Sequence, residues 1–229
     1  MPLKGKDFWG PPTWITLHIL AFCLRVEVAD SFREFLVVLT KLIPCQECRD
    51  NLVKKLNYVP PGEYLSSSEK AFLYTYIIHD LANQHISKQK KTLKVSPPFD
   101  GIYEKYHHHL KTNDYPPGFW GPNVWSVIHI FAATTTPENG EYFAKFLILL
   151  CDLLPDQNSR QLLHSFLVKK SPQMYLRSNH DTFFYSYLLH DFVNQRLGKK
   201  RSPPYSYVKP IYFTALGKEC EECNVNSSK

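Results

Sequence analysis

Residues 8–14 read FWGPPTW, and residues 119–125 read FWGPNVW. The same shift of 111 residues carries His18 onto His129 and aligns HDLANQ at 79–84 with HDFVNQ at 190–195. Self-similarity at one constant offset across about eighty residues is the signature of an internal repeat. The chain is therefore interpreted as a tandem duplication, in which the SPP stretches at 96–98 and 202–204 follow a shorter shift of 106.

Each copy carries a helical rather than a strand-like pattern. Apolar residues recur three and four positions apart, which is the spacing of a helix buried along one face. In the first copy the stripes are Trp14, Leu17, His18, Ala21 and Phe22; Phe32, Phe35, Leu36, Leu39 and Ile43; Leu52, Val53 and Leu56; and Phe72, Tyr76, His79 and Asn83. A short fifth helix is expected over 103–110, after the prolines at 97 and 98.

The predicted architecture is all-α, with two tandem four-helix bundles that each carry a short fifth helix. The first domain is placed at residues 1–112, the second at 113–216 and a polar tail at 217–229. A unit of this size hides roughly two-thirds of its unfolded surface, so each could hold its own core.

Composition limits the function classes. The 229 residues are 44% hydrophobic and 14% aromatic, which is typical of a packed protein. We expect no membrane partner, because no apolar run is long enough to span a bilayer, and no secretory signal at the MPLKGKD start. The net charge of +6 gathers at 88–94 and 199–201, where it suits helix ends, and no nucleic-acid motif accompanies it.

Four of the six cysteines form two CxxC pairs, Cys45 with Cys48 and Cys220 with Cys223. The first pair follows Pro44 and opens a helix, where unpaired N–H groups stabilise a thiolate. On spacing alone, a redox disulfide and half of a four-ligand zinc site are equally good interpretations. The second copy has Asp156 and Ser159 at these positions, and loss of the sulfurs from one copy favours redox chemistry over a structural staple.

Two pairs of ring and polar side chains share helix faces, because their members are four residues apart. They are Trp14 with His18, and His79 with Asn83. Core packing around a satisfied histidine explains either pair alone. Together they predict a planar polar ligand held between the helices of the bundle.

These residues resemble the Erv/ALR family of FAD-dependent sulfhydryl oxidases, and the lead-in resembles the short versions from large DNA viruses. The family pattern is Trp-x-x-x-His, then Cys-x-x-Cys, then His-Asn-x-Val-Asn-x-x-Leu-x-Lys, and Asp80 and Ala82 depart from the last of these. The resemblance implies an FAD site lined by Gly10, Trp14, His18, His79, Asn83, Lys88 and an aromatic residue such as Phe99.

The resemblance also implies the reaction. A thiol-containing substrate protein or a thioredoxin-like relay would reduce the Cys45–Cys48 disulfide at Cys45. Cys48, next to the flavin, would pass the electrons on to FAD and then to O2, which leaves as hydrogen peroxide. Cys220 and Cys223 would form a shuttle on a flexible arm, with an idle CxxC as the alternative.

The second copy keeps the corresponding cofactor set without the disulfide. Trp125, His129, His190, Asn194 and Lys199 form a possible second FAD site, and the resemblance leaves open whether this copy still binds a flavin. We expect this copy to stand in for the partner subunit of the family's homodimer, as an intrachain pseudo-dimer, with a true homodimer as the alternative. By resemblance, the host cytoplasm or a virion is preferred over the mitochondrial intermembrane space.

The rival function is a non-catalytic helical interaction module with a vestigial or zinc-binding CxxC. No metal site is otherwise predicted. Cys23 and Cys151 lie on apolar faces and are expected to be buried, inert thiols. The run His107-His108-His109 is interpreted as solvated polar filler in the connector between copies.

Overall fold

The computed structural model describes residues 4–91, 95–110, 116–199 and 202–217, and all ten longer elements in these ranges are α-helices, as predicted. The first half of the chain comprises α1 Lys6–Phe22, α2 Ala29–Leu42, α3 Gln46–Tyr58, α4 Ser68–Lys90 and α5 Phe99–Leu110. The second half comprises α6 Pro117–Thr134, α7 Gly140–Leu153, α8 Gln157–Lys169, α9 Asn179–Arg196 and α10 Tyr205–Leu216. Short 3-10 turns lie at Val26–Val28, Gly62–Ser66 and Pro172–Tyr175.

Side-chain caps explain where several of these helices begin. Ser67 and Ser178 cap α4 and α9, and each hydroxyl accepts the backbone N–H three residues on. Such a cap satisfies one of the N–H groups that a helix start leaves unpaired. These caps explain why α4 begins at Ser68 and α9 at Asn179.

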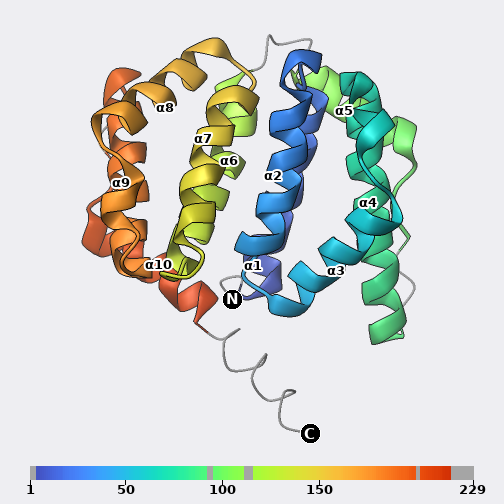
Figure 1. The fold of residues 1–229 in the computed structure, drawn as a ribbon, viewed down its shortest axis with the longest axis horizontal. Coiled ribbons are helices and arrows are strands. Elements are labelled where there is room, and N and C mark those ends of the chain that lie inside the picture. The colour runs from blue at the N-terminus through green and yellow to red at the C-terminus, as the bar shows by residue number, and fades with distance from the viewer. Residues whose placement is uncertain (1–3, 92–94, 111–115, 200–201, 218–229) are drawn as a thin grey trace, which may run out of the picture.

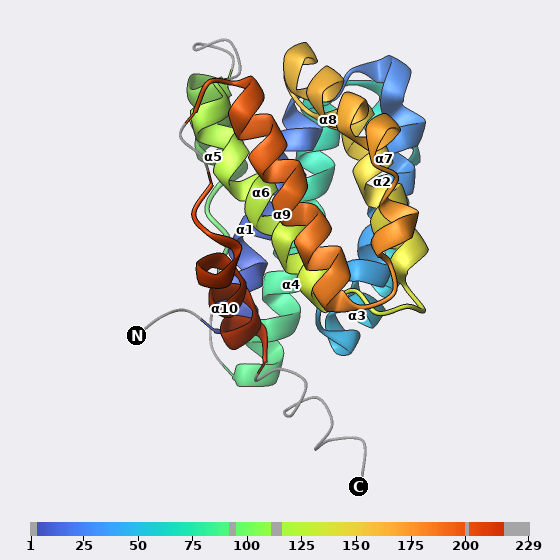
Figure 2. The same cartoon turned by 90° about the vertical axis from the view of Figure 1, so that its left-hand side faces the viewer.

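The two halves lie side by side, with their first two helices in the middle (Figure 1). Helix α1 packs against α6 and α2 packs against α7. Helices α3 and α4 flank this central group on one side, and α8 and α9 flank it on the other (Figure 1). Figure 2 shows α10 lying below α5, beside the lower ends of α1 and α6.

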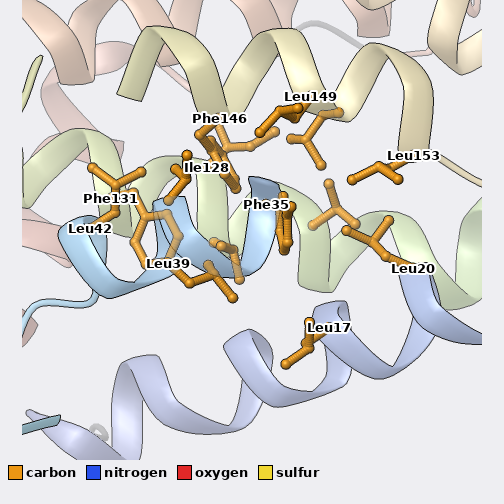
Figure 3. Close-up of a cluster of buried hydrophobic side chains, with 14 of the residues drawn as sticks. Leu17, Leu20, Phe35, Leu39, Leu42, Ile128, Phe131, Phe146, Leu149 and Leu153 are labelled. Carbon is orange, nitrogen blue, oxygen red and sulfur yellow. The ribbon is translucent and has the colours of Figure 1, made fainter. Parts of the chain in front are cut away.

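One continuous apolar core crosses the boundary between the halves (Figure 3). Phe35 of α2 and Phe146 of α7 are both buried, and their ring centroids lie 5.6 Å apart. Leu17 and Leu20 approach from α1, and Ile128 and Phe131 from α6, as seen in Figure 3. Either half alone would expose these apolar side chains to water.

Contacts at the ends of the halves are reciprocal. Tyr106 of the first half meets Phe119 edge-on at 6.2 Å, and Tyr212 of the second half meets Phe8 edge-on at 5.7 Å. The N–H of Gly5 also donates to the Ala215 carbonyl at 3.0 Å. The end of α10 therefore lies against the start of α1.

Three sequence predictions about single side chains were wrong. Val53 is 39% exposed, because it lies beside rather than on the α3 stripe that buries Leu52. Cys23 and Cys151 are partly exposed rather than buried, although burial still raises the pKa of Cys151 to about 12.

The histidine run lies inside α5 and not in a connector. His107 and His108 are exposed, but the ring of His109 stacks on Phe119 at 4.6 Å. That contact joins α5 to α6, so the run is more than solvated filler. None of the helices in the described ranges is both long and apolar enough to cross a membrane.

Candidate functional site

A chain of hydrogen bonds connects α1 to α4 in the first half. The Thr75 hydroxyl donates to the Phe72 carbonyl at 2.8 Å, so its oxygen is left to accept from Nδ1–H of His18, also at 2.8 Å. His18 Nε2 must then accept, and His79 Nδ1 lies 3.0 Å from it. The network thus assigns the tautomer of His18 and makes Nδ1–H of His79 the donor to His18 Nε2.

The second half repeats this chain with a different hydroxyl. Ser186 donates to the Phe183 carbonyl at 2.7 Å and lies 2.9 Å from Nδ1 of His129. His129 Nε2 in turn lies 3.0 Å from Nδ1 of His190. Thr75 and Ser186 were missed by sequence reasoning, although both are hydroxyl residues related by the 111-residue shift.

Burial keeps these histidines uncharged. Desolvation, helped by the charge of the neighbouring histidine, lowers the pKa of His18 and of His129 to about 3. Burial also lowers the pKa of His190 to about 4. At neutral pH these rings therefore act as hydrogen-bonding groups and not as cations.

Acid is expected to destabilise the protein through these groups. The unfolded chain takes up protons below a pKa of 6.5, whereas folded His18 and His129 stay neutral down to about 3. Their contribution is thus fully present above pH 6.5 and is lost as the pH falls, by ~2 kcal/mol for each group at pH 5. Urea unfolding at pH 7.5 and pH 5 measures the loss.

A matched pair of variants checks the origin of this pH dependence. The loss of stability should be smaller in His129→Gln, and it should be unchanged in His164→Gln, which alters an exposed histidine on α8. Equal unfolding free energies of the unmutated protein at the two pH values would contradict the assignment.

The structure brings together part of the predicted cofactor set. The rings of Trp14 and His79 stack with centroids 4.1 Å apart and planes 2° apart, and His18 lies behind them. Asn83 is buried and donates to the Ser96 hydroxyl at 3.0 Å. Phe99 packs on Phe72 and Tyr76 rather than on the stacked pair.

Of the other two predicted residues, Gly10 adjoins this cluster and Lys88 lies apart from it. Gly10 is on α1, one turn before Trp14, with open space where a side chain would begin. Lys88 lines a separate groove of about 280 Å³ between α3 and α4, together with Lys54, Lys55 and His85. This groove is basic, which sequence reasoning did not predict.

All five residues of the predicted second set line one cavity. Its volume is about 530 Å³, and Trp125, His129, His190, Asn194 and Lys199 all contribute to its wall. Trp125 stacks on His190 with centroids 4.0 Å apart and planes 4° apart. Asn194 donates to the Ser202 hydroxyl at 3.1 Å. Ser202 corresponds to Ser96 at the shorter 106-residue shift, so both halves have the same asparagine–serine hydrogen bond.

The CxxC pair opens α3, as predicted. Cys45 is the N-cap residue, and its Sγ accepts the N–H of Cys48 at 3.2 Å. Cys45 is 1% exposed and Cys48 is partly exposed. The hydrogen bond with Cys45, and then burial, raise the pKa of the Cys48 thiol. The Cys45 sulfur thus lies at the N-terminus of α3, beside the backbone N–H groups of its first turn.

Asp156 takes the place of Cys45 in the second half. It caps α8, and its Oδ1 accepts the Ser159 N–H at 2.8 Å. Arg160 donates to the carbonyl of Leu154 at 2.7 Å, just as Arg49 donates to that of Ile43 at 2.6 Å. The second half therefore keeps the helix start with a carboxylate cap and without sulfur.

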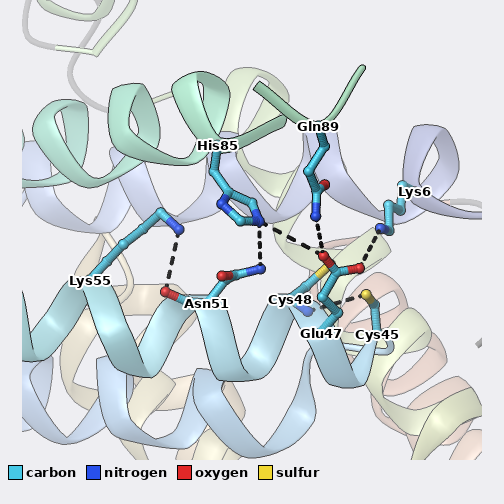
Figure 4. A network of polar contacts seen from close by, with 8 residues as sticks. All are labelled: Lys6, Cys45, Glu47, Cys48, Asn51, Lys55, His85 and Gln89. Atoms are coloured by element: carbon cyan, nitrogen blue, oxygen red, sulfur yellow. Dashed lines mark hydrogen bonds and ion pairs between the residues drawn. The ribbon is translucent and has the colours of Figure 1, made fainter. Parts of the chain in front are cut away.

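A polar network crosses the face of α3 next to the cysteines (Figure 4). Glu47, which lies between them in sequence, accepts from Gln89 at 2.5 Å and lies 4.0 Å from Lys6 and 3.8 Å from His85. These contacts lower the pKa of Glu47, with Gln89 as the main cause. Sequence reasoning missed this network, and the position of Glu47 inside the CxxC was its one signal.

Removing the charge of Glu47 should lower the pKa of Cys48. Glu47 raises that pKa through its charge, whereas Lys6 lowers it. Since Glu47 is about half exposed, Glu47→Gln should increase the thiolate fraction by roughly threefold. The pH dependence of alkylation at Cys48 in the reduced protein measures this fraction.

Asp50→Asn is the matched control for Glu47→Gln. It removes the same charge from α3 at a residue whose carboxylate bonds Gln46 and does not act on Cys48. A thiolate fraction that rises equally in both variants would mean that net charge, and not the Glu47 contact, sets the pKa.

The remaining predicted residues are outside the described ranges. Cys220 and Cys223 lie in the undescribed segment 218–229. Within the described ranges, no three His, Cys, Asp or Glu side chains are arranged to hold a metal ion. The zinc alternative, which needs Cys220 and Cys223, stays untested.

Comparison with known proteins points to one family. The Erv1/Alr family matches residues 11–104. A putative FAD-linked sulfhydryl oxidase of Invertebrate iridescent virus 3 is 25% identical over 131 residues, which cover 53% of this chain and 84% of that protein. An FAD-linked sulfhydryl oxidase of African swine fever virus is 28% identical over 106 residues, covering 44% of this chain and 87% of that protein. No solved structure matches the chain significantly.

Proposed function

Since the chain belongs to the Erv1/Alr family through residues 11–104 and is an FAD-dependent sulfhydryl oxidase, we propose that its Cys45–Cys48 pair is the redox centre. One observation carries the proposal. The two sulfurs lie at the first turn of α3, next to α1 and α4, and these two helices supply the buried histidines and the stacked Trp14. A dithiol and a site for a planar cofactor are thereby built from the same three helices.

The residues of the first half fit FAD. The Trp14–His79 stack offers a flat aromatic surface for a ring system, and the neutral His18 behind it adds a hydrogen-bonding group without charge. The groove lined by Lys54, Lys55 and Lys88 lies on another face of α4 and is separate from this wall. FAD, when bound, accepts two electrons and lets O2 take them up as hydrogen peroxide.

The cysteines would perform thiol–disulfide exchange. A substrate thiolate attacks the Cys45–Cys48 disulfide and forms a mixed disulfide. A second substrate thiol then displaces the protein sulfur, so that the substrate leaves oxidised and Cys45 and Cys48 hold two electrons and two protons. Lys6 and Glu47 lie over this pair and adjust the pKa of Cys48 in opposite directions.

The division of roles between the sulfurs stays a prediction. Cys45 as the exchanging sulfur requires access to a residue that is 1% exposed here. The N–H of Cys48 that stabilises it is provided by the first turn of α3, so a small outward movement of this turn would expose the sulfur without unfolding the helix.

The experiment for the function is oxygen uptake by the purified full chain. With dithiothreitol as substrate, we expect one hydrogen peroxide for each disulfide formed, and no uptake without the protein. A protein with bound flavin that consumes no oxygen with dithiol would contradict the assignment of Cys45 and Cys48 as its redox centre.

We also propose that Cys220 and Cys223 relay electrons from protein substrates. The described chain ends at Gly217, just after Ala215, whose carbonyl bonds Gly5 beside Lys6. Cys220 follows Gly217 by three residues in sequence, so the tail pair directly follows the helix whose end contacts the start of α1.

Replacing both tail cysteines separates a relay from an idle pair. Cys220→Ser with Cys223→Ser should slow the oxidation of a reduced protein such as unfolded ribonuclease by roughly tenfold, while dithiothreitol oxidation stays nearly unchanged. Unchanged rates for both substrates would remove the relay.

A further inference from the structure

The cavity of the second half has the size and the wall of a cofactor site. Its volume of about 530 Å³ lies between α6, α8, α9 and α10, in the range that small-molecule and cofactor sites occupy. Most of the wall is apolar or aromatic, with a few polar groups among it. It lies outside residues 11–104, which match the family.

The polar groups indicate the chemistry of a ligand. Trp125 and His190 form a flat stacked wall, and the hydrogen-bond chain from Ser186 leaves Nε2 of a neutral His190 as an acceptor. Such a wall suits a planar heterocycle that carries an N–H donor. Lys199, also in the wall, adds a positive charge for a phosphate.

Corresponding contacts repeat those of the first half closely. The two histidine pairs have the same 3.0 Å separation, and the two tryptophan stacks differ by 0.1 Å. A ligand that fits the Trp14–His79 wall therefore meets the same groups at the Trp125–His190 wall. The halves differ at the start of α8, where Asp156 and Ser159 replace both cysteines, and at Lys199, which lines this cavity whereas Lys88 lines a separate groove.

From this geometry we propose that the second half binds its own FAD, which dithiols do not reduce. The cavity holds the flavin, but Ser159 on its wall has no sulfur with which to accept electrons from a thiol. The second FAD would act as a structural ligand that fills the cavity. The proposal rests on the proposed function only in taking FAD as the ligand of the first half.

The test counts flavin in the purified full chain, after incubation with excess FAD and gel filtration. We expect about two flavins per chain, of which about half lose their visible absorbance upon anaerobic addition of dithiothreitol. One flavin per chain that is fully bleached would overturn the second site and leave the oxidase intact. Two flavins that are both bleached would show that dithiols reduce the second flavin, which would overturn that part of the proposal.

A cavity-filling variant assigns the unbleached flavin to its site. Gly121 is buried in the wall, and a side chain added there would meet nothing within 4 Å, so Gly121→Phe would fill the cavity without a backbone clash. This variant should bind one flavin per chain, all of it bleached. Gly10→Phe is the matched variant of the first half, and its remaining flavin should not be bleached.

Placing two cysteines at the start of α8 tests why dithiols do not reduce the second flavin. Asp156→Cys combined with Ser159→Cys should make both flavins reducible, because it places a CxxC pair at the start of α8. Circular dichroism and thermal unfolding of each variant show whether it folds. Failure of the folded double variant to bleach the second flavin would contradict the proposed reason, and absence of any flavin from the unmutated chain would instead sink the FAD assignment of both halves.

Discussion

Cys48→Ser should abolish oxygen uptake driven by dithiol and leave flavin bound. A serine hydroxyl forms no disulfide and is not ionised near neutral pH, so the pair can neither exchange with a thiol nor store its electrons. The rate should fall to background, a loss on the order of a thousandfold or more. The side chain is partly buried and of similar size, so the fold and the Trp14–His79 stack should persist.

Cys151→Ser is the matched control for this variant. Cys151 is also a partly exposed free thiol, but it lies on α7, where it bonds the Leu147 carbonyl. Its replacement should leave the oxidation rate within about twofold of that of the unmutated chain, because a similar-sized substitution at a partly exposed residue changes the stability little. Turnover that survives in Cys48→Ser but not in Cys151→Ser would move the redox centre away from α3.

The second large effect concerns stability and the joining of the halves. Phe146→Ala should lower the free energy of unfolding by ~3–5 kcal/mol, because it leaves a cavity in a close-packed core. Phe146 is fully buried and touches Phe35 of the other half as well as Phe131 and Phe143. Urea unfolding followed by circular dichroism measures the change.

Flavin fluorescence in the same titration shows whether the halves unfold together. If the second half stands in for a partner subunit, flavin release from the first half should shift to lower urea in parallel with the loss of helix. Ile148→Ala, on the same helix and 53% exposed, should change stability by less than about 0.5 kcal/mol. If Phe146→Ala releases flavin at the same urea concentration as the unmutated chain, the halves unfold as independent units, divided between residues 112 and 113 as the sequence predicts.

The intrachain pseudo-dimer itself stays a proposal, supported by the reciprocal pairs Tyr106–Phe119 and Phe8–Tyr212. Reciprocity of this kind is the mark of a two-fold interface between equivalent surfaces. A chain that already contains both surfaces should be monomeric, with a mass near 26.7 kDa in solution.

Much of the fold could be predicted because its elements follow simple local rules. The stripe of Phe32, Phe35 and Leu39 is buried as its spacing indicated. Helix α2 ends at Leu42, just before Pro44, and Cys45 caps the next helix. The internal repeat then extended the same prediction to the second half, where Trp125 and His190 meet as Trp14 and His79 do.

Other features depend on which faces meet, and sequence periodicity does not carry that information. The Lys6–Glu47–His85 network joins three helices through exposed charged groups that follow no apolar stripe. Lys88 lies on a different face of α4 from His79, and the family motif records only their spacing. Helix α1 already begins at Lys6 and contains Pro11 and Pro12. Prolines usually interrupt a helix, so the sequence pattern does not indicate this early start.

The central claim, that electrons from a dithiol enter a flavin through Cys45 and Cys48, is tested most directly by one absorbance measurement. A visible spectrum of the purified full chain is recorded under anaerobic conditions before and after dithiothreitol is added, in parallel with Cys48→Ser. The account predicts a yellow protein whose flavin absorbance falls with dithiol and returns with air, and a variant whose absorbance does not fall. A protein that stays colourless after incubation with FAD, or a variant that bleaches like the unmutated chain, would contradict it.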